Sequence, residues 1–121
     1  MYATLGTNQT IHQNQFLMSE NASYYLRLQP DGNLVGYTSQ DFVPKNAFWS
    51  SKTDGKGNAP FRLVMQLDNN LVIYDGSNKP TWASKTDGKG VKGASKVVMQ
   101  NDRNIVIYDG TGKPIWASKT D

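Results

Sequence analysis

The amino-acid sequence predicts an all-β fold of three small antiparallel sheets, on the basis of three observations. One segment recurs three times along the chain, its runs of β-branched and aromatic residues are short and end in Asp, Asn or Gly, and no stretch has helical periodicity. The length of 121 residues is typical of one domain, and the aromatic content of 11% is typical of a folded chain. We therefore expect a single domain over residues 1–121.

The three repeats are recognised most easily by a glutamine in each. Gln29, Gln66 and Gln100 are 37 and 34 residues apart, so each repeat is much longer than a heptad and shorter than a domain. We place the repeats at about 17–54, 55–88 and 89–121. A unit of this size cannot bury its apolar face alone, so the three units should share one core.

Each repeat carries the signals of three or four short strands. Residues 71–74 have strand composition, and residues 30–32 combine Pro, Asp and Gly in an order that favours a tight turn. Repeat one separates its last motif tyrosine from its tryptophan by 12 positions, against 8 in the others, which predicts an extra loop of about four residues between Thr38 and Phe48. The tryptophans occupy matched positions and are expected in the shared core; they are Trp49, Trp82 and Trp116.

Five residue types recur at alternate positions in every repeat, while the residues between them vary. Residues two apart on a strand share a face, so Asn, Val and Tyr should point one way and the turn should bring Gln and Asp beside them. Asp and Asn alone could serve only the turn, but that role leaves the recurrence of Gln and Tyr unexplained. Together, the amides, carboxylate and phenol can satisfy several sugar hydroxyls, and Val offers a small apolar surface. The predicted sugar-binding residues are Gln29, Asp31, Asn33, Val35 and Tyr37; Gln66, Asp68, Asn70, Val72 and Tyr74; and Gln100, Asp102, Asn104, Val106 and Tyr108.

The pattern Gln-x-Asp-x-Asn-x-Val-x-Tyr resembles the signature of the monocot mannose-binding lectins, also called snowdrop-type or bulb-type lectins. All three copies match it at every defined position, and the likeness extends from Phe16 and Leu17 to the C-terminus. The resemblance implies a β-prism II fold, with three four-stranded sheets about a pseudo-threefold axis and the tryptophans at its centre. It also implies that Asp and Asn bind the axial O2 of mannose, Gln binds O3, Tyr binds O4, and Val packs on the ring carbons.

The same resemblance implies the partners of the chain. We expect mannose-containing glycans or glycoproteins as ligands, no metal or other cofactor, and a homodimer that exchanges the C-terminal strand, residues 113–121. The sequence departs from many plant members in having no cysteine for their disulfide, and in placing Gly36 where the other repeats have Ile73 and Ile107. With its longer loop, site one is therefore expected to be the weakest.

Other function classes have less support in the sequence. A glycosidase needs two carboxylates across the scissile bond, whereas each motif has one, and His12 has no partner for a triad or a histidine metal site. The Asp-x-Asn pairs begin like a calcium loop but lack its later Gly and Glu. The lectin module of a bacteriocin or toxin, or a cytoskeleton-associated adaptor using the same sugar sites, stays open as an alternative.

Charge and hydropathy set expectations about nucleic acids, membranes and location. The net charge of +3 arises largely from lysines in turns, and no helix or stacking platform gathers them, so we expect no nucleic-acid binding. No apolar run approaches the 18 or so residues of a membrane helix, and residues 2–15 lack a signal-peptide core. We therefore expect no membrane insertion and a soluble protein that is cytoplasmic or secreted by a non-classical route.

Overall fold

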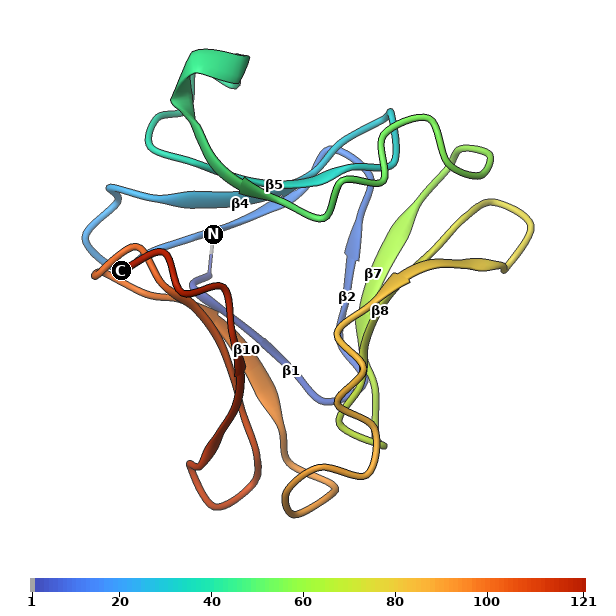
Figure 1. Ribbon diagram of the computed structural model, residues 1–121, viewed down its shortest axis with the longest axis vertical. Coiled ribbons are helices and arrows are strands. Elements are labelled where there is room, and N and C mark those ends of the chain that lie inside the picture. Colours follow the sequence, from blue (N-terminus) through green and yellow to red (C-terminus); the bar gives the residue numbers. More distant parts are fainter. Residues whose placement is uncertain (1) are drawn as a thin grey trace.

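The computed structural model describes residues 2–121 and arranges them as three four-stranded antiparallel sheets around a common axis (Figure 1). The first sheet has the order β3 (Phe16–Met18), β4 (Tyr25–Leu28), β5 (Leu34–Tyr37) and β6 (Ala47–Ser50). The second has the order β2 (Thr10–His12), β7 (Arg62–Met65), β8 (Leu71–Tyr74) and β9 (Pro80–Ala83). The third has the order β1 (Thr4–Gly6), β10 (Lys96–Met99), β11 (Ile105–Tyr108) and β12 (Pro114–Ala117). The predicted all-β, β-prism II architecture is confirmed.

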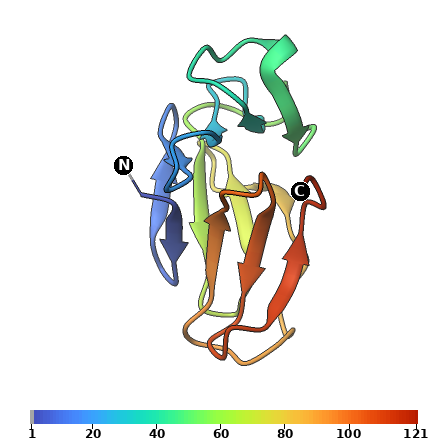
Figure 2. The ribbon, with the colours of Figure 1, turned by 90° about the vertical axis from the view of Figure 1, so that its left-hand side faces the viewer.

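The N-terminal segment gives one short strand to each sheet, which the sequence did not predict. β1 pairs with β10, β2 with β7 and β3 with β4, so residues 4–18 connect all three sheets. Tight turns join β1 to β2 and β2 to β3, and each places an asparagine in the left-handed region, Asn8 at φ 66° and Asn14 at φ 74°. Figure 2 shows these strands on the side of the molecule opposite β12.

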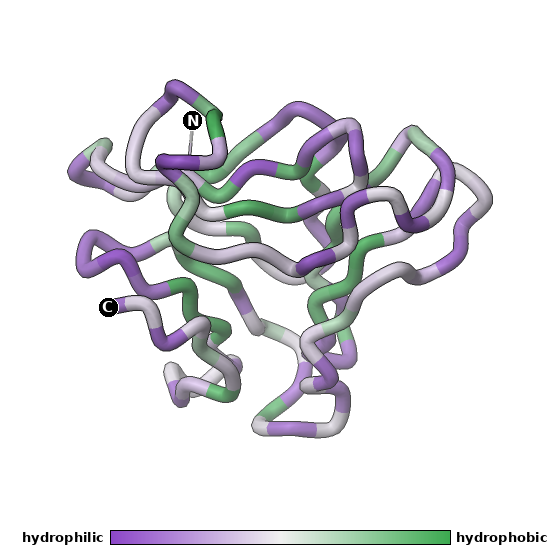
Figure 3. Tube along the Cα trace, turned by 45° about the horizontal axis from the view of Figure 1, so that its top comes forward, coloured by the Kyte–Doolittle hydropathy of each residue, from purple (hydrophilic) through white to green (hydrophobic). Residues whose placement is uncertain are grey.

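Alternation along the strands puts one face of every sheet into a shared core. Figure 3 shows the apolar residues following the strands and the hydrophilic residues gathering in the turns. Fully buried side chains from all three sheets meet at the axis; they include Leu26, Leu28, Leu34, Leu63, Met65, Leu71, Ile73, Val97, Met99, Ile105 and Ile107. Because successive side chains of a strand point to opposite faces, the residues that alternate with these core residues lie on the outer face of each sheet.

The three tryptophans pack against this core and against one another, as expected. Their rings meet edge to face in all three pairings, with centroids 5.7 to 6.0 Å apart. They lie on β6, β9 and β12 and are half-buried, because they close the core at the edge of each sheet. Edge-to-face packing suits the quadrupoles of aromatic rings.

Repeat one compensates internally for its glycine. A Cβ on Gly36 would lie 2.6 Å from Cζ of Phe48, so the phenylalanine fills the space that Ile73 and Ile107 occupy in the other repeats. The predicted extra loop follows β5 and contains a single 3-10 turn, η1 (Pro44–Asn46). Among residues 2–121, no helix is long and apolar enough to cross a membrane.

Candidate functional site

Each motif occupies the hairpin between the second and third strands of its sheet. In repeat two, the Gln66 backbone N–H donates to the Asn70 carbonyl at 2.9 Å and closes the turn, and the other repeats do the same. The residue before the motif Asn adopts a left-handed conformation in every repeat, at φ 86° for Gly32, 76° for Asn69 and 74° for Arg103. The predicted turn is therefore confirmed, although only repeat one uses the glycine that suits this conformation best.

A chain of hydrogen bonds links Asp, Gln and Tyr in every site. Asp68 accepts the Asn70 backbone N–H at 3.0 Å and the Gln66 side-chain amide at 3.1 Å, and the Gln66 Oε1 accepts the Tyr74 hydroxyl. Sites one and three repeat this geometry with Asp31, Gln29 and Tyr37 and with Asp102, Gln100 and Tyr108. These hydrogen bonds fix the orientation of the Gln amide. Because the Tyr hydroxyl donates its hydrogen to Gln, the Tyr oxygen is left to act as an acceptor.

The motif Asn supports the site from below, a role that the sequence did not reveal. The Asn70 Oδ1 accepts the Ser84 hydroxyl at 3.2 Å and the backbone N–H groups of Lys85 and Thr86 at 3.0 and 3.3 Å. Asn33 and Asn104 hold the matching tails after Trp49 and Trp116. The recurrent Ser-Lys-Thr sequence after each tryptophan was the signal for this contact.

The remaining polar atoms face outward over a valine floor. Val35, Val72 and Val106 are only 4%, 3% and 4% exposed, whereas the motif aspartates are exposed and the asparagines half-buried. Within residues 2–121 the Nδ2 of each motif Asn makes no hydrogen bond to the protein. The Gln Nε2 donates one N–H to the motif Asp, which leaves its second N–H available to a ligand. Each site therefore offers amide donors, carboxylate acceptors and a phenol oxygen around a small apolar floor.

Two further carboxylates, Asp75 and Asp109, directly follow the motif tyrosines of repeats two and three, and both accept several hydrogen bonds from the protein backbone. Asp75 is 2% exposed, and backbone hydrogen bonds, first from Lys79 and then from Asn58 and Ser77, hold its pKa below the ordinary value. The pKa of Asp109 is lowered in the same way, first by the Thr111 hydroxyl. Because they bond to the following turn and to a neighbouring loop, these groups act as local supports.

Site one differs from the others through its longer loop. The loop lays Phe42 on the outer face of its sheet, with its ring centroid 5.1 Å from that of Tyr37 and 5.5 Å from that of Phe16. The Arg27 guanidinium lies 4.8 Å from the centre of the Phe42 ring. Tyr37 is consequently only 4% exposed, and its pKa is raised by this burial, which Arg27 opposes and Asp31 reinforces.

The motif of site one is nevertheless intact. Its hydrogen-bond chain matches those of the other sites, and Val35 is as exposed as Val106. The loop therefore adds an aromatic wall beside the tyrosine and leaves the valine floor as it is elsewhere. Gly36, which weakened the expectation for this site, belongs to the inner face and is compensated by Phe48.

In site two, Arg62 packs on the ring of the motif tyrosine Tyr74, whereas in site one Phe42 packs on the equivalent tyrosine, Tyr37. The Arg62 guanidinium lies 4.7 Å from the Tyr74 ring centre, and its Nη1 donates to the Asn78 side chain at 2.9 Å. Site three places Lys96 opposite Tyr108 in the strand register. The three sites thus share one motif and differ in the side chains around it.

Comparisons of sequence connect the chain to two curated proteins. It is 37% identical over 76 residues to curculin-2 of Molineria latifolia and 41% identical over 75 residues to the B-type lectin plumieribetin of Scorpaena plumieri. These matches span 43% and 59% of the length of those proteins. No protein-family model matches the chain.

Comparisons of structure extend over nearly the whole chain. A monomeric monocot mannose-binding lectin from Gastrodia elata is 38% identical, with a TM-score of 0.83 and 98% of both chains covered. The mannose-specific agglutinin of snowdrop, Galanthus nivalis, solved with methyl-α-D-mannoside, is 36% identical, with a TM-score of 0.76 and coverage of 98% of this chain and 97% of that one. The Polygonatum cyrtonema lectin, solved with a monomannoside, is 34% identical with a TM-score of 0.76 and the same coverage. The chain therefore belongs to the family of monocot mannose-binding lectins, which are carbohydrate-binding proteins and not enzymes.

Proposed function

We propose that the chain binds mannosides, without a metal ion, at up to three sites formed by its three motifs. The observation that carries this proposal is the identical arrangement of Asp, Gln, Tyr and Asn in all three sites, with free donors and acceptors facing outward. The snowdrop and Polygonatum lectins, which share the fold, were solved with mannosides. In this proposal Asp and Asn bind the axial O2, Gln binds O3 and Tyr binds O4.

The chemistry of each site supports binding that does not depend on a metal ion. Each motif has one carboxylate, and that group already accepts hydrogen bonds from Asn and Gln. Sugar hydroxyls can exchange their bound water for hydrogen bonds that amide N–H groups donate and that amide and carboxylate oxygens accept. The selectivity for mannose over glucose then resides at O2, where Asp31, Asp68 and Asp102 are the acceptors.

Each site on its own should bind weakly. The sites are shallow and their valine floors are small, so we expect a monosaccharide Kd of about 1 mM, or roughly −4 kcal/mol. Useful affinity then requires two or more sites to engage one branched glycan or surface, which can add roughly 10² to 10⁴-fold without a new contact. This reasoning favours a multivalent lectin.

Titration with simple sugars in EDTA tests the proposal. Methyl-α-mannoside should shift the amide resonances of the three motifs, whereas methyl-α-galactoside should leave them unchanged. Loss of mannoside binding in EDTA would exclude the metal-independent mechanism. Equal binding of both sugars would exclude the proposed role of the aspartates. A glycan array would then identify the preferred linkages.

A further inference from the structure

The outer face of the second sheet carries an imidazole and a guanidinium beside the tyrosine of site two. His12 on β2 pairs with Arg62 on β7, and Arg62 pairs with Tyr74 on β8, so these residues form one cross-strand row. The residues next to them along the strands, Ile11 and Leu63, are buried in the core, so both side chains lie on the outer face. The row therefore meets site two at the tyrosine end of its motif.

Two contacts hold the Arg62 guanidinium in place. It lies 4.7 Å from the centre of the Tyr74 ring, and its Nη1 donates to the Asn78 side chain at 2.9 Å. Among residues 2–121 it donates to no carboxylate, so its positive charge has no anionic partner there. Because a stacked and hydrogen-bonded guanidinium has little side-chain freedom left to lose, it is preorganised to bind an anion.

A hollow of about 360 Å³ opens beside this guanidinium, and its lining includes His12, Gln13, Phe61, Arg62 and Asp75. The Gln13 Oε1 accepts the Phe61 backbone N–H at 3.1 Å, which leaves the amide nitrogen of Gln13 as a donor. The imidazole of His12 is exposed and adds a second donor, and Arg62 keeps the N–H groups on Nε and Nη2. The hollow is therefore lined by several hydrogen-bond donors.

The carboxylate of Asp75, which also lines the hollow, is occupied by the protein. Its Oδ1 accepts the backbone N–H groups of Ser77 and Lys79, both at 2.9 Å. Its Oδ2 accepts the Asn58 backbone N–H at 3.2 Å. Because these N–H dipoles offset the negative charge, Asp75 does not cancel the attraction of the hollow for an anion.

The proposed orientation of mannose puts O6 at this end of the site. In that orientation O2 binds at Asp68, near the turn, and O4 binds at Tyr74. Since C4 is bonded to C5, which carries C6 and O6, the O6 hydroxyl is the neighbour of O4. A substituent on O6 would therefore extend from the tyrosine toward Arg62 and the hollow.

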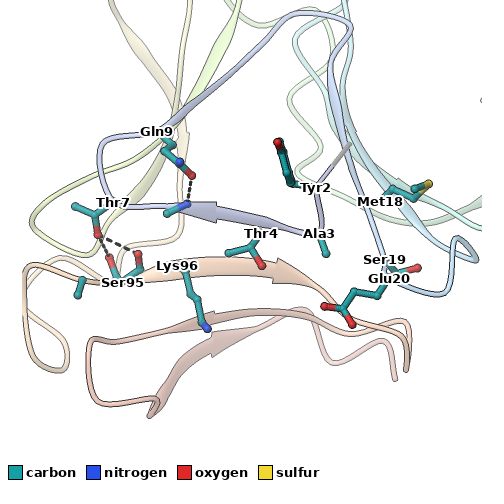
Figure 4. A pocket seen from close by; sticks show the side chains of 12 residues that line it. Tyr2, Ala3, Thr4, Thr7, Gln9, Met18, Ser19, Glu20, Ser95 and Lys96 are labelled. Atoms are coloured by element: carbon teal, nitrogen blue, oxygen red, sulfur yellow. Dashed lines mark hydrogen bonds between the residues drawn. The ribbon is translucent and has the colours of Figure 1, made fainter.

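The equivalent rows of the other sites differ in charge. In site one, Met18 and Tyr25 replace the imidazole and the guanidinium, so the row carries no cation. In site three, Gly6 and Lys96 take these positions, and the lysine is exposed. Figure 4 shows that Lys96 lies on the wall of a groove of about 850 Å³ that also carries the Glu20 carboxylate, which would repel an anion. Among the described residues, site two alone places a fixed guanidinium opposite the motif tyrosine.

We infer that site two binds mannose that carries a phosphate ester on O6, with Arg62 as the main phosphate ligand and His12 and Gln13 as further donors. This inference rests on the proposed mannose binding and deepens it at one site. A guanidinium binds phosphate oxygens through two parallel charge-assisted hydrogen bonds. Arg62 is then a specificity determinant that distinguishes site two from the other two sites.

The test uses chains that keep one site each. The variant D31A/D102A leaves site two, and D31A/D68A leaves site three as the matched control. Calorimetric or NMR titration compares methyl-α-mannoside with methyl-α-mannoside 6-phosphate, and the readout is the ratio of the two Kd values on the same chain. The phosphate ester should bind site two about tenfold more tightly than the plain mannoside, with little difference at site three. Inorganic phosphate at the same concentration should give no comparable response, because no sugar anchors it.

Adding Arg62→Met to the site-two chain keeps the apolar stem and should remove most of this gain. Because the ratio compares two ligands on one chain, any loss that both ligands share cancels. His12→Ala, at an exposed position, is the second variant and should lower the gain by a smaller factor.

Arg27→Met in the same chain is the matched control for the loss of a guanidinium. Arg27 also lies on an aromatic ring, at 4.8 Å from the centre of Phe42, and donates to the Asn14 side chain at 2.9 Å, but it stands opposite Val35 in repeat one. Its substitution should leave the gain intact.

Three results would overturn the inference while the mannose assignment stands. They are an equal ratio at sites two and three, a gain that survives both Arg62→Met and His12→Ala, and a response to inorganic phosphate as strong as that to the ester. Failure of both chains to bind methyl-α-mannoside would instead overturn the proposed function, and the inference with it.

Discussion

Mutation can distinguish the structural role of Asn70 from the proposed sugar-binding role of Asp68. Asn70→Ala removes the acceptor for the Ser84 hydroxyl and for the backbone N–H groups of Lys85 and Thr86. Ser84 and Thr86 are buried, at 9% and 1% exposed, so these donors cannot all turn to water. With a net value of about 0.5–1.5 kcal/mol for each hydrogen bond, the free energy of unfolding should fall by about 2–3 kcal/mol. At roughly 4 °C per kcal/mol, Tm should fall by about 8–12 °C.

Asp68→Ala should have the opposite profile. The carboxylate is exposed, and its bonds are to the Asn70 N–H and the Gln66 amide, which water can reach. Its loss should cost about 1 kcal/mol of stability or less. Without the acceptor at O2 and the partner that orients Gln66, mannoside binding at site two should weaken by about 1–3 kcal/mol, or roughly 5- to 150-fold.

Thermal melting and NMR titration of the two variants distinguish these roles. Leu67→Ala is the matched control, since Leu67 lies in the same turn and its side chain is 56% exposed. Its effect on stability should stay within about 0.5 kcal/mol. An Asn70→Ala chain that melts like the wild type would refute the supporting role of the amide oxygen. An Asp68→Ala chain that keeps full binding at site two would refute the assignment of the motif as the sugar site.

Four further expectations follow from the packing around the sites. Gly36→Ile should destabilise the protein by about 1–3 kcal/mol through overpacking against Phe48, and the double variant with Phe48→Thr should recover most of the loss, as measured by denaturant unfolding. The pKa of Asp109 in the folded protein lies below its ordinary value of 3.8, so its carboxylate should contribute stability that is complete above pH 3.8 and is lost as the pH falls below it. Asp109→Asn should therefore make Tm less dependent on pH in the acid range. Phe42→Ala should expose Tyr37 and lower its raised pKa, as followed by the ultraviolet absorbance of tyrosinate. Light scattering should detect a homodimer of the 13.4 kDa chain, and a strict monomer at micromolar concentration would exclude exchange of the C-terminal strand, which pairs with β11 of its own chain in this structure.

The sequence predicted those features that recur within each repeat. The period of the motif, the polar turns and the matched tryptophans each appeared three times, so local patterns were enough to predict three sheets and a shared core. The grouping of Gln, Asp and Tyr also followed from residue spacing on a strand and a tight turn. The outcome in the structure is the same hydrogen-bond chain in every repeat.

Features that occur once could not be predicted in this way. β1, β2 and β3 have three residues each, too few to show a periodic pattern, and their partners lie far along the chain, as when Leu5 pairs with Val97. The position of Phe42 depends on the fold of a loop without internal repetition. The docking of Asn21 on Asn101 likewise depends on the tertiary arrangement, which places residues 80 positions apart in contact.

The features that occur only once in the chain would determine how the three equivalent motifs differ in sugar binding. If the motifs alone set affinity, the three sites would be interchangeable, and any mannose-rich surface would serve equally well. The structure instead surrounds them with an aromatic wall at Phe42, a guanidinium over Tyr74, and an open polar groove at Glu20. If each site is weak alone, as we propose, small differences in the contacts of the next sugar residue would decide which sites engage together, and multivalency would amplify that difference. Glycan selectivity would then be encoded in the loop after β5 and the turn after β3, which are the parts of the chain that break its internal symmetry.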